Sequence, residues 1–531
     1  MGNSANSKKT QRVRKYNVPD KKRLLYAILV LVSLSLFSYS TVFDNSFTNW
    51  DDEEMLVNNS SVRSLSVGNI YNIFTTCTLS HYHPLVTISY ALEYRFFELD
   101  PFIFHLTNLL LHIFSSVLVY LVFWKLLENM NMAVVIALLF AVHPVHVESV
   151  AWVTERKDML YMAFYLLALL MYILSKTAKK RNYSPFLYLF FILSCFSKAS
   201  AVTLPLILLA IDYYYNNRLS KKDISDKLPL ILISLIFGII NINAQYKMPF
   251  DGAELEIPHY TYIERALIVF YNYCYYIYKT VFPFQLSAFY PYPEGSLSIL
   301  YVLAPLLTVL IFYLAIKSAR GGNRIVFLGF LIYTITILPV LQIVPVGRAI
   351  AADRFVYFPI TGLFLIIAYY ANSLYSSKIR QAKYKRALQI VFLICLLVFS
   401  LLSRQQADVW QNSYTLYTGM IAENQGNSVA FNNRAVLFLN DKKYEEAERD
   451  LKKAILINPK YPAALNNLGL VNSGRGDYDK AISFFEEAIR LDPLYAEAFL
   501  SLGIVYANKK ENERSAECYR TAIKIDPEFA Q

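Results

Sequence analysis

The chain has 531 residues, of which 56% are hydrophobic and 17% are charged. A soluble domain is about one quarter charged, so this composition excludes an ordinary water-soluble protein. The net charge of +11 does not indicate nucleic-acid binding, because most Lys and Arg residues lie between hydrophobic segments, where they act as orientation signals. The five cysteines have no framework spacing, which argues against a disulfide scaffold or a Cys-based metal site.

The first hydrophobic run extends from Leu24 to Val42 and follows a strongly basic start, residues 1–23. No small-residue cleavage motif follows it, so we expect a retained first span with a cytoplasmic N-terminus. Eleven runs are long enough to cross about 30 Å of hydrocarbon. They begin near Leu24, Phe102, Ala133, Met159, Pro185, Ala199, Leu228, Leu297, Ile325, Phe355 and Ala387.

Charge sets the expected orientation of these spans. With the N-terminus inside, the inner segments of residues 1–403 carry 25 Lys and Arg residues and the outer segments carry ten. A twelfth apolar stretch runs from Tyr262 to Phe282. If it crossed the membrane, the later inner segments would become outer ones and the charge bias would be reversed. We therefore expect this stretch to lie along the outer interface or to be re-entrant, within residues 247–296. The membrane domain is then 24–403, with a first outer loop at 43–101. An odd number of spans leaves everything after Ser403 outside.

The C-terminal part carries an internal repeat. Asn458-Pro459, Asp492-Pro493 and Asp526-Pro527 are spaced by 34 residues, the period of a tetratricopeptide repeat. Small residues recur in the same frame at Ala454, Ala488 and Ala522 and at Ala447, Ala481 and Ser515. We expect three repeats (428–461, 462–495 and 496–529, in a domain 428–531) after a capping helix within 404–427. Such arrays hold peptides, although a spacer or oligomerisation role is the alternative.

Acidic residues open the first outer loop shortly after the first span. Asp51 and Asp52 are candidates for a catalytic base, and only one can be an ideal base, because adjacent carboxylates split their pKa values. A hydrated acidic turn is the alternative.

A histidine pair lies at the predicted outer end of the third span. His143, His146 and Glu148 could share a divalent metal, since two His and one carboxylate can ligate zinc. Pro144 disrupts the helix there, so the spacing need not put both imidazoles on one face. A hydrogen-bonded span terminus is the alternative.

Basic residues gather at three predicted outer turns, where Arg forks suit phosphate oxygens. Ordinary headgroup contact or internal ion pairing is the alternative. The candidates for binding a lipid-linked phosphate are Arg156, Lys157, Lys198, Arg348 and Arg354, with Asp158 and Asp353 beside them.

Several motifs together resemble the transmembrane-and-tetratricopeptide O-mannosyltransferase family, whose animal members glycosylate cadherins, and more distantly the protein O-mannosyltransferases. The motifs are His105-Leu-Thr-Asn-Leu-Leu-Leu-His112, Ala141-Val-His-Pro-Val-His-Val-Glu-Ser-Val-Ala-Trp152, Ser197-Lys198, Ala352-Asp-Arg-Phe-Val-Tyr-Phe-Pro359 and the repeats. The resemblance covers nearly the whole chain. It implies an all-α, polytopic GT-C-type bundle followed by a tetratricopeptide solenoid, and a glycosyltransferase that uses a polyprenyl-phosphate sugar such as dolichyl-phosphate mannose.

The resemblance also implies roles for individual residues. It places Asp51 at the base position of the acidic pair, matches Arg156 and Asp158 to the residues after the His-Pro motif, and matches Arg354 to the Arg before the aromatic-Pro motif. The chain departs from the family at His83-Pro84, where Arg-Pro is common, and at Lys198-Ala199, where Lys-Glu is common. These departures bear on sugar and lipid preference.

The sequence therefore predicts an inverting transfer of a sugar, mannose by resemblance, from a lipid phosphate to Ser or Thr of an extracytoplasmic protein held by the repeats. No metal is obligatory, although a divalent ion at the histidine pair stays open. A transferase acting on a lipid or polysaccharide and a non-catalytic membrane scaffold are the alternatives. The expected location is a bacterial or archaeal cytoplasmic membrane, or the endoplasmic reticulum of a eukaryote.

Overall fold

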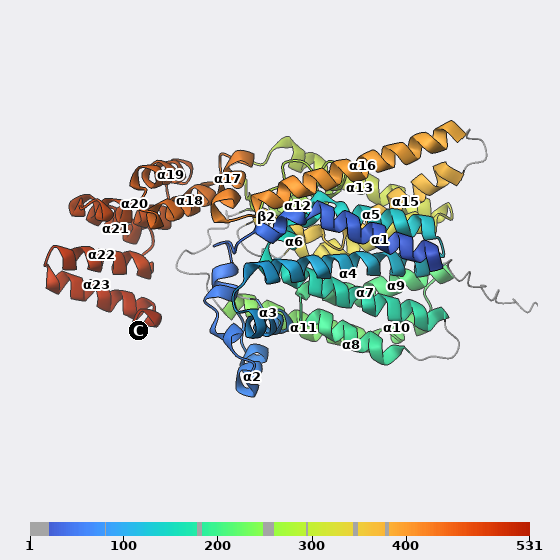
Figure 1. The fold of residues 1–531 in the computed structure, drawn as a ribbon, viewed down its shortest axis with the longest axis horizontal. Helices are drawn as coiled ribbons and strands as arrows, with labels where there is room; N and C mark the ends of the chain where they lie inside the picture. Colours follow the sequence, from blue (N-terminus) through green and yellow to red (C-terminus); the bar gives the residue numbers. More distant parts are fainter. Residues whose placement is uncertain are drawn as a thin grey trace, which may run out of the picture.

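The protein consists of a bundle of long helices and, at one end of it, an array of short helices (Figure 1). The computed structural model describes residues 21–79, 81–177, 183–247, 260–293, 296–343, 349–376 and 382–530. Most of the predicted basic N-terminus, 1–20, and part of the predicted interfacial segment therefore lie outside the described residues.

Each of the eleven hydrophobic runs contains a helix of the bundle. These helices are α1 (Lys21–Ser38), α4 (Pro101–Leu127), α5 (Met130–Val142), α7 (Arg156–Thr177), α8 (Ser184–Cys195), α9 (Leu204–Asn216), α11 (Leu228–Lys247), α13 (Ile299–Arg320), α14 (Arg324–Ile337), α15 (Ile360–Ser376) and α16 (Ala382–Val409).

Five helices of the described chain are long and apolar enough to cross a membrane, and a bent pair adds a sixth. The bend, of 53°, joins α5 to the segment Pro144–Ala151, where proline interrupts the helix as expected. The other runs form shorter helices, so the number of spans stays a prediction. The first helix, α1, begins at the end of the bundle farthest from the array, and α16 ends beside the array (Figure 1).

The outer surface of the bundle is apolar. Of the most hydrophobic stretch of 18 residues in each helix, 61% is buried in α4 and α7, whereas only 17% is buried in α13 and α16. Large side chains such as Leu306 and Leu393 point outward and are 69% and 63% exposed. An apolar surface of this extent would be costly in water, so the bundle belongs to a membrane protein.

The Tyr-rich helix α12 (Tyr262–Val281) contacts the end of the bundle that adjoins the array. Its Asn272 amide donates to the carbonyl of Ile350 (2.8 Å), and the carbonyl of Thr280 lies 3.0 Å from Nε2 of His143. Hydropathy does not place α12 among the candidate spans. This arrangement is compatible with the predicted interfacial position.

Short elements cover the same end of the bundle. From the first predicted outer loop come η1 (Ser40–Asp44), η2 (Glu53–Val57), η3 (Ser60–Arg63), α2 (Val67–Thr75) and α3 (Pro84–Phe97), and from later turns η4 (Pro144–His146), α6 (Val147–Ala151), η5 (Val153–Glu155), η6 (Ala199–Thr203) and η8 (Asp353–Val356). The strands β1 (Tyr290–Pro291) and β2 (Ala349–Ala351) pair antiparallel. The remaining short elements are α10 (Lys221–Ser225) and η7 (Leu338–Val340).

The array consists of three helix pairs in the predicted register. They are α18 (Ser428–Asn440) with α19 (Tyr444–Ile457), α20 (Pro462–Gly474) with α21 (Tyr478–Leu491), and α22 (Ala496–Asn508) with α23 (Asn512–Ile525), followed by η9 (Pro527–Ala530). Small residues lie where helices touch: Ala454 and Ala488 are fully buried, and a Cβ added at Gly469 would lie 2.5 Å from the ring of Phe485. The three predicted helical repeats are therefore confirmed.

The capping helix α17 (Ser413–Glu423) lies within the predicted range 404–427. The last helix of the bundle, α16, continues past Ser403 to Val409 before α17 begins. Leu416, Tyr417 and Met420 of α17 belong to the same hydrophobic core as the bundle. The array is therefore packed on the bundle through its capping helix.

We predict that the array is extracytoplasmic and that the opposite end of the bundle is cytoplasmic. In a variant whose five cysteines are replaced by Ser, Lys453→Cys, on the exposed face of α19, should react with an impermeant thiol reagent in intact cells. Lys222→Cys, on α10, should react only after lysis. The reverse labelling pattern would contradict the orientation.

Candidate active site

A set of charged side chains, here called the ionic cluster, lies where η5, α6, α7 and η8 meet. Its members are Glu148, Glu155, Lys157, Asp158, Lys198 and Arg354. The bend after α5 places Glu148 on the short helix α6, and η5 runs directly into the first turn of α7. Residues from three separate predicted turns are therefore brought together: Glu148 and the run Glu155 to Asp158 from the first, Lys198 from the second and Arg354 from the third.

Glu155 lies at the centre of the cluster and is fully buried. Its Oε1 is 2.7 Å from Nζ of Lys157 and 3.2 Å from Nε of Arg354, and its Oε2 is 3.9 Å from Nζ of Lys198. A buried carboxylate is stable only when it is paired, and here one carboxylate holds three cations. Glu155 is not among the candidate residues predicted from the sequence.

Arg354 is held by two carboxylates. Its backbone N–H donates to Oε2 of Glu148 (2.8 Å), and its Nη1 forms an ion pair with the other oxygen of that carboxylate. The guanidinium lies over the ring of Trp152, with 5.4 Å between the guanidinium carbon and the ring centroid. Its Nη2 donates to none of the described residues, so this nitrogen can bind a ligand oxygen.

Lys198 forms the other edge of the cluster. Its ammonium pairs with Asp158, whose second oxygen accepts a hydrogen bond from Ser149 (3.1 Å). The Lys198 side chain is 13% exposed and that of Arg354 is 19% exposed. Both cations therefore keep an accessible side while carboxylates fix their positions.

Asp51 lies within the electrostatic field of this cluster and is only partly buried. Burial raises the pKa of its carboxyl to about 7, although Lys157 and Arg354 act in the opposite direction. No described residue donates a hydrogen bond to this carboxylate. An accessible carboxylate that titrates near neutral pH suits a general base.

Asp52 has a different environment from its neighbour. Its Oδ2 accepts from the backbone N–H of Thr48 (2.8 Å) and from the Thr48 hydroxyl (3.0 Å), and its Oδ1 accepts from the N–H of Thr154 (3.2 Å). It is 1% exposed, and burial raises its pKa to about 6. Asp52 thus fixes the first loop to η5, which leaves Asp51 as the better base.

Arg156 faces away from Lys157 and is fully buried. It donates to Asn108 (2.8 Å) and to the carbonyl of Phe104 (2.9 Å), and it pairs with Glu93. These contacts join α7 to α3 and α4. They fit a structural role better than the phosphate-binding role that the sequence suggested.

The histidine pair does not form a metal site with Glu148. Nε2 of His143 lies 3.0 Å from the Thr280 carbonyl, and His146 is packed among rings, with its centroid 4.5 Å from that of Phe140. Glu148 is engaged by Arg354 instead. Within the described ranges no three His, Cys, Asp or Glu side chains are grouped so as to hold a metal, so the geometry gives this hypothesis no support.

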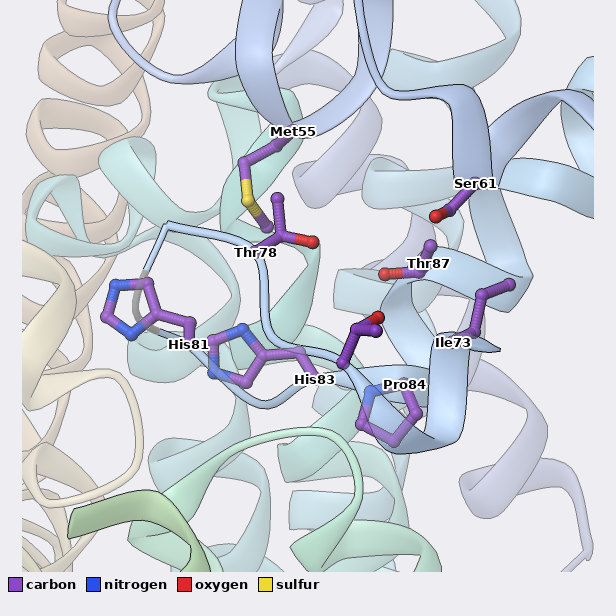
Figure 2. A pocket seen from close by; sticks show the side chains of 9 residues that line it. Met55, Ser61, Ile73, Thr78, His81, His83, Pro84 and Thr87 are labelled. Carbon is purple, nitrogen blue, oxygen red and sulfur yellow. The ribbon is translucent and has the colours of Figure 1, made fainter. Parts of the chain in front are cut away.

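A narrow pocket lies within the first predicted outer loop, and Figure 2 shows the rings of His81 and His83 at its edge. The rings are stacked, with centroids 5.1 Å apart. Burial lowers the pKa of His81 to about 3 and that of His83 well below its usual value, and Lys157 lowers both further. Both imidazoles are therefore neutral, so His83 cannot replace the cation of the Arg-Pro motif. The sequence had not singled out His81.

Two other candidates have separate surroundings. Asp353 accepts from the hydroxyl of Tyr290 (3.0 Å), and burial raises the pKa of its carboxyl well above the usual range. It supports the β1–β2 region and is not paired with Arg354. Arg348 lies outside the described residues.

Known proteins resemble the chain in both of its parts. Two family models, each described as tetratricopeptide repeat, match residues 427–493 and 473–528. Protein O-mannosyl-transferase F38B6.6 of Caenorhabditis elegans is 28% identical over 82% of this chain. Human protein O-mannosyl-transferase TMTC3 is 23% identical over 73% of it. The chain is a relative of these O-mannosyl-transferases.

The O-mannosyl-transferase relatives are longer than this chain, which matches 63% of the worm protein and 46% of the human one. Among solved structures, the crystal structure of MamA is 21% identical, covers 28% of this chain and 86% of that chain, and superposes with a TM-score of 0.21.

We predict that Glu155→Gln destabilises the protein by about 3–5 kcal/mol, because it leaves buried cations without their counter-charge. The measurement is the thermal melting of the purified protein in detergent. Glu448→Gln is the matched control: this carboxylate is 28% exposed and pairs with Lys452 and Arg475, and such surface pairs contribute about 0–1 kcal/mol. Equal melting of the two variants would show that Glu155 does not organise the cluster.

Proposed function

We propose that the chain is a membrane glycosyltransferase that moves a sugar, mannose, from a polyprenyl-phosphate donor to Ser or Thr hydroxyls of a protein. The observation that carries this proposal is the partly buried Asp51, which lies within the electrostatic field of cations that carboxylates hold in place. The similarity to proteins named protein O-mannosyl-transferase supports the sugar and the protein acceptor.

Asp51 acts on the acceptor. Its carboxylate takes the proton of the Ser or Thr hydroxyl while that oxygen forms a bond to the anomeric carbon of the donor. The carbon–oxygen bond to the phosphate breaks, and its electron pair leaves with the polyprenyl phosphate. A single displacement of this kind inverts the anomeric configuration. General-base help of about 10² to 10⁴ is typical.

Arg354, Lys157 and Lys198 act on the leaving group, because the phosphate gains negative charge as the bond breaks. Donors that are already fixed need no reorganisation during the reaction, which makes such electrostatic stabilisation effective. The unbonded Nη2 of Arg354 and the exposed side of Lys198 are the contacts available to phosphate oxygens. Glu155 and Glu148 are positioning residues for these cations.

The array binds the acceptor protein. Its capping helix packs on the bundle beside the first loop: the Tyr417 hydroxyl lies 2.7 Å from Oδ1 of Asn49, two residues before Asp51. An acceptor bound by the repeats can therefore reach the base without a separate delivery step. The proposed place of the site and the array is the extracytoplasmic side.

We predict that Asp51→Asn folds but loses two to four orders of magnitude in turnover, the usual contribution of a general base. The assay is sugar transfer from a polyprenyl-phosphate donor to a Ser/Thr-rich peptide, with a thermal melt of each variant. In wild type the base must be ionised, so a pKa of about 7 predicts that kcat/KM falls about tenfold per pH unit below pH 7. The residual rate of Asp51→Asn should lack this dependence.

Asp52→Asn serves as the control for that experiment. It loses one acceptor oxygen for Thr48 or Thr154, so its melting temperature should fall while the pH profile of the folded fraction keeps its shape. Wild-type turnover in a folded Asp51→Asn variant would contradict the assignment of the base. Transfer only to a lipid or polysaccharide acceptor would favour that alternative, and no transfer by any variant would favour a scaffold.

A further inference from the structure

A second pocket lies in the first predicted outer loop, between η3, the start of α2 and the end of α3. It has a volume of about 670 Å³ and is open to the surface. Two arginines and one glutamate, Arg63, Arg95 and Glu98, line it together with the ring of Tyr94. None of these residues belongs to the ionic cluster. We call this site the arginine pocket.

The two arginines carry charge that no described carboxylate neutralises. Arg63 donates from Nη2 to the carbonyl of Val57, and its guanidinium carbon lies 4.4 Å from the centroid of the Tyr94 ring. Its Nη1 is buried and has no hydrogen-bond partner among the described residues. Arg95 is exposed and forms no ion pair within the described part of the chain. A partly buried guanidinium without a counter-charge is costly, so an anion in this pocket would be stabilising.

The arginine pocket lies at the expected boundary of the membrane. α3 ends at Phe97, and α4, which is long and apolar enough to cross a membrane, begins at Pro101. The rings of Phe96, Phe97 and Phe102 are exposed around this junction. Aromatic side chains gather at headgroup depth, so the pocket lies where lipid phosphates are found.

The short helix α2 supports the same placement. Figure 1 shows it projecting from the side of the bundle, near the end that adjoins the array. Its Val67 and Tyr71 are four residues apart and therefore lie on one face, and both are exposed. An exposed apolar face on a short helix beside a span is typical of a helix that lies in the membrane interface.

The charges of the pocket select the kind of ligand. Two arginines (+2) and Glu98 (−1) give it a net charge of +1, which matches the single negative charge of a phosphodiester. The planar fork of Arg suits phosphate oxygens. A phosphate monoester carries about −1.5 to −2 at neutral pH, and Glu98 would repel its second charge. Phospholipids are the phosphodiesters that a membrane offers in the largest amount.

We propose that the arginine pocket binds the phosphodiester headgroup of a membrane phospholipid. Arg63 and Arg95 hold the phosphate, and the acyl chains pass Phe96 and Phe102 into the membrane. This inference goes beyond the proposed function and does not depend on it, because lipid binding requires no sugar transfer. The phospholipid is a structural ligand and not the sugar donor.

A bound headgroup would fix the first loop. Arg63 is the last residue of η3, and its bond to the Val57 carbonyl joins it to the end of η2. η2 in turn begins directly after Asp51 and Asp52. The phospholipid therefore links the segment that carries the candidate base to the membrane surface.

The first experiment measures binding at this pocket alone. In the full-length protein with its five cysteines replaced by Ser, Gly68→Cys carries a bimane fluorophore, because a Cβ added there meets nothing within 4 Å. A phosphatidylglycerol with a spin label in its acyl chain is titrated in micelles of an uncharged maltoside detergent, and quenching of the fluorophore gives Kd. Arg63→Gln/Arg95→Gln should raise Kd about 25-fold, since each basic residue near an anionic lipid contributes about fivefold.

Matched controls separate a specific site from general attraction to lipid. Arg218→Gln/Arg320→Gln, at two exposed arginines of the predicted inner segments, should leave Kd unchanged. A spin-labelled diacylglycerol, which lacks the phosphate, should bind weakly and equally to the parent protein and to Arg63→Gln/Arg95→Gln. If the latter variant does not fold, as judged by its thermal melt, Arg95→Gln alone should raise Kd about fivefold. Equal Kd values for phosphatidylglycerol in the parent and the folded variant, or diacylglycerol bound as tightly as phosphatidylglycerol, would overturn the proposal.

Competition identifies the source of the phosphate. Unlabelled phosphatidylglycerol should relieve the quenching, whereas glycerophosphoglycerol, the same headgroup without acyl chains, should not do so at equal concentration. Equal relief by glycerophosphoglycerol, by a polyprenyl-phosphate hexose or by a Glu-rich peptide would show that a soluble phosphate ester, the sugar donor or an acidic protein segment occupies the pocket. Any of these three results would overturn the phospholipid assignment.

Discussion

The ion pairs of Glu155 are the interaction on which the site depends. This fully buried carboxylate contacts Lys157, Lys198 and Arg354, which come from different turns at one end of the helix bundle. Three cations would repel one another without it. With it, they are held together while Lys198 and Arg354 each keep an accessible side. A bundle whose lipid-facing helices are apolar can therefore present positive charge at a single place.

The second constraint is the packing of the capping helix on the bundle. Leu416 and Tyr417 share the bundle's hydrophobic core, and the ring of Trp410 stacks on that of Trp152 with centroids 5.3 Å apart. Trp152 in turn lies under the Arg354 guanidinium. The capping helix and the first loop thus share one packed core, on which the phosphate-binding candidate Arg354 lies, while the later repeats have cores of their own. The array is attached close to the candidate base by its capping helix.

The fold could be predicted from the sequence to the extent that it is encoded locally. Hydrophobic runs and a 34-residue period are visible in one dimension, and each run and each repeat forms the expected helices. Nothing in Arg404 to Val409 interrupts a helix, so α16 runs past Ser403, where the membrane domain was expected to end. The number of membrane crossings depends on the lipid environment as well as on the chain.

The site was only partly predictable. Asp51, Lys157, Lys198 and Arg354 were selected because charges at span ends are costly without a role. Neighbouring residues of a helix point about 100° apart, so in the run from Glu155 to Asp158 one residue faces α3 and α4 while others face the cluster. The sequence could not tell Arg156 from Lys157 in this respect. It also could not separate Asp51 from Asp52, since their difference lies in the hydrogen bonds that Thr48 and Thr154 donate.

Product analysis tests the central claim most directly. The purified full-length chain is incubated with a polyprenyl-phosphate hexose and a Ser/Thr-rich peptide, and the peptide is examined by mass spectrometry and NMR. The account predicts one hexose linked to a Ser or Thr oxygen, with an anomeric configuration opposite to that in the donor. A folded protein that leaves the peptide unmodified, or a product that retains the donor's configuration, would contradict it.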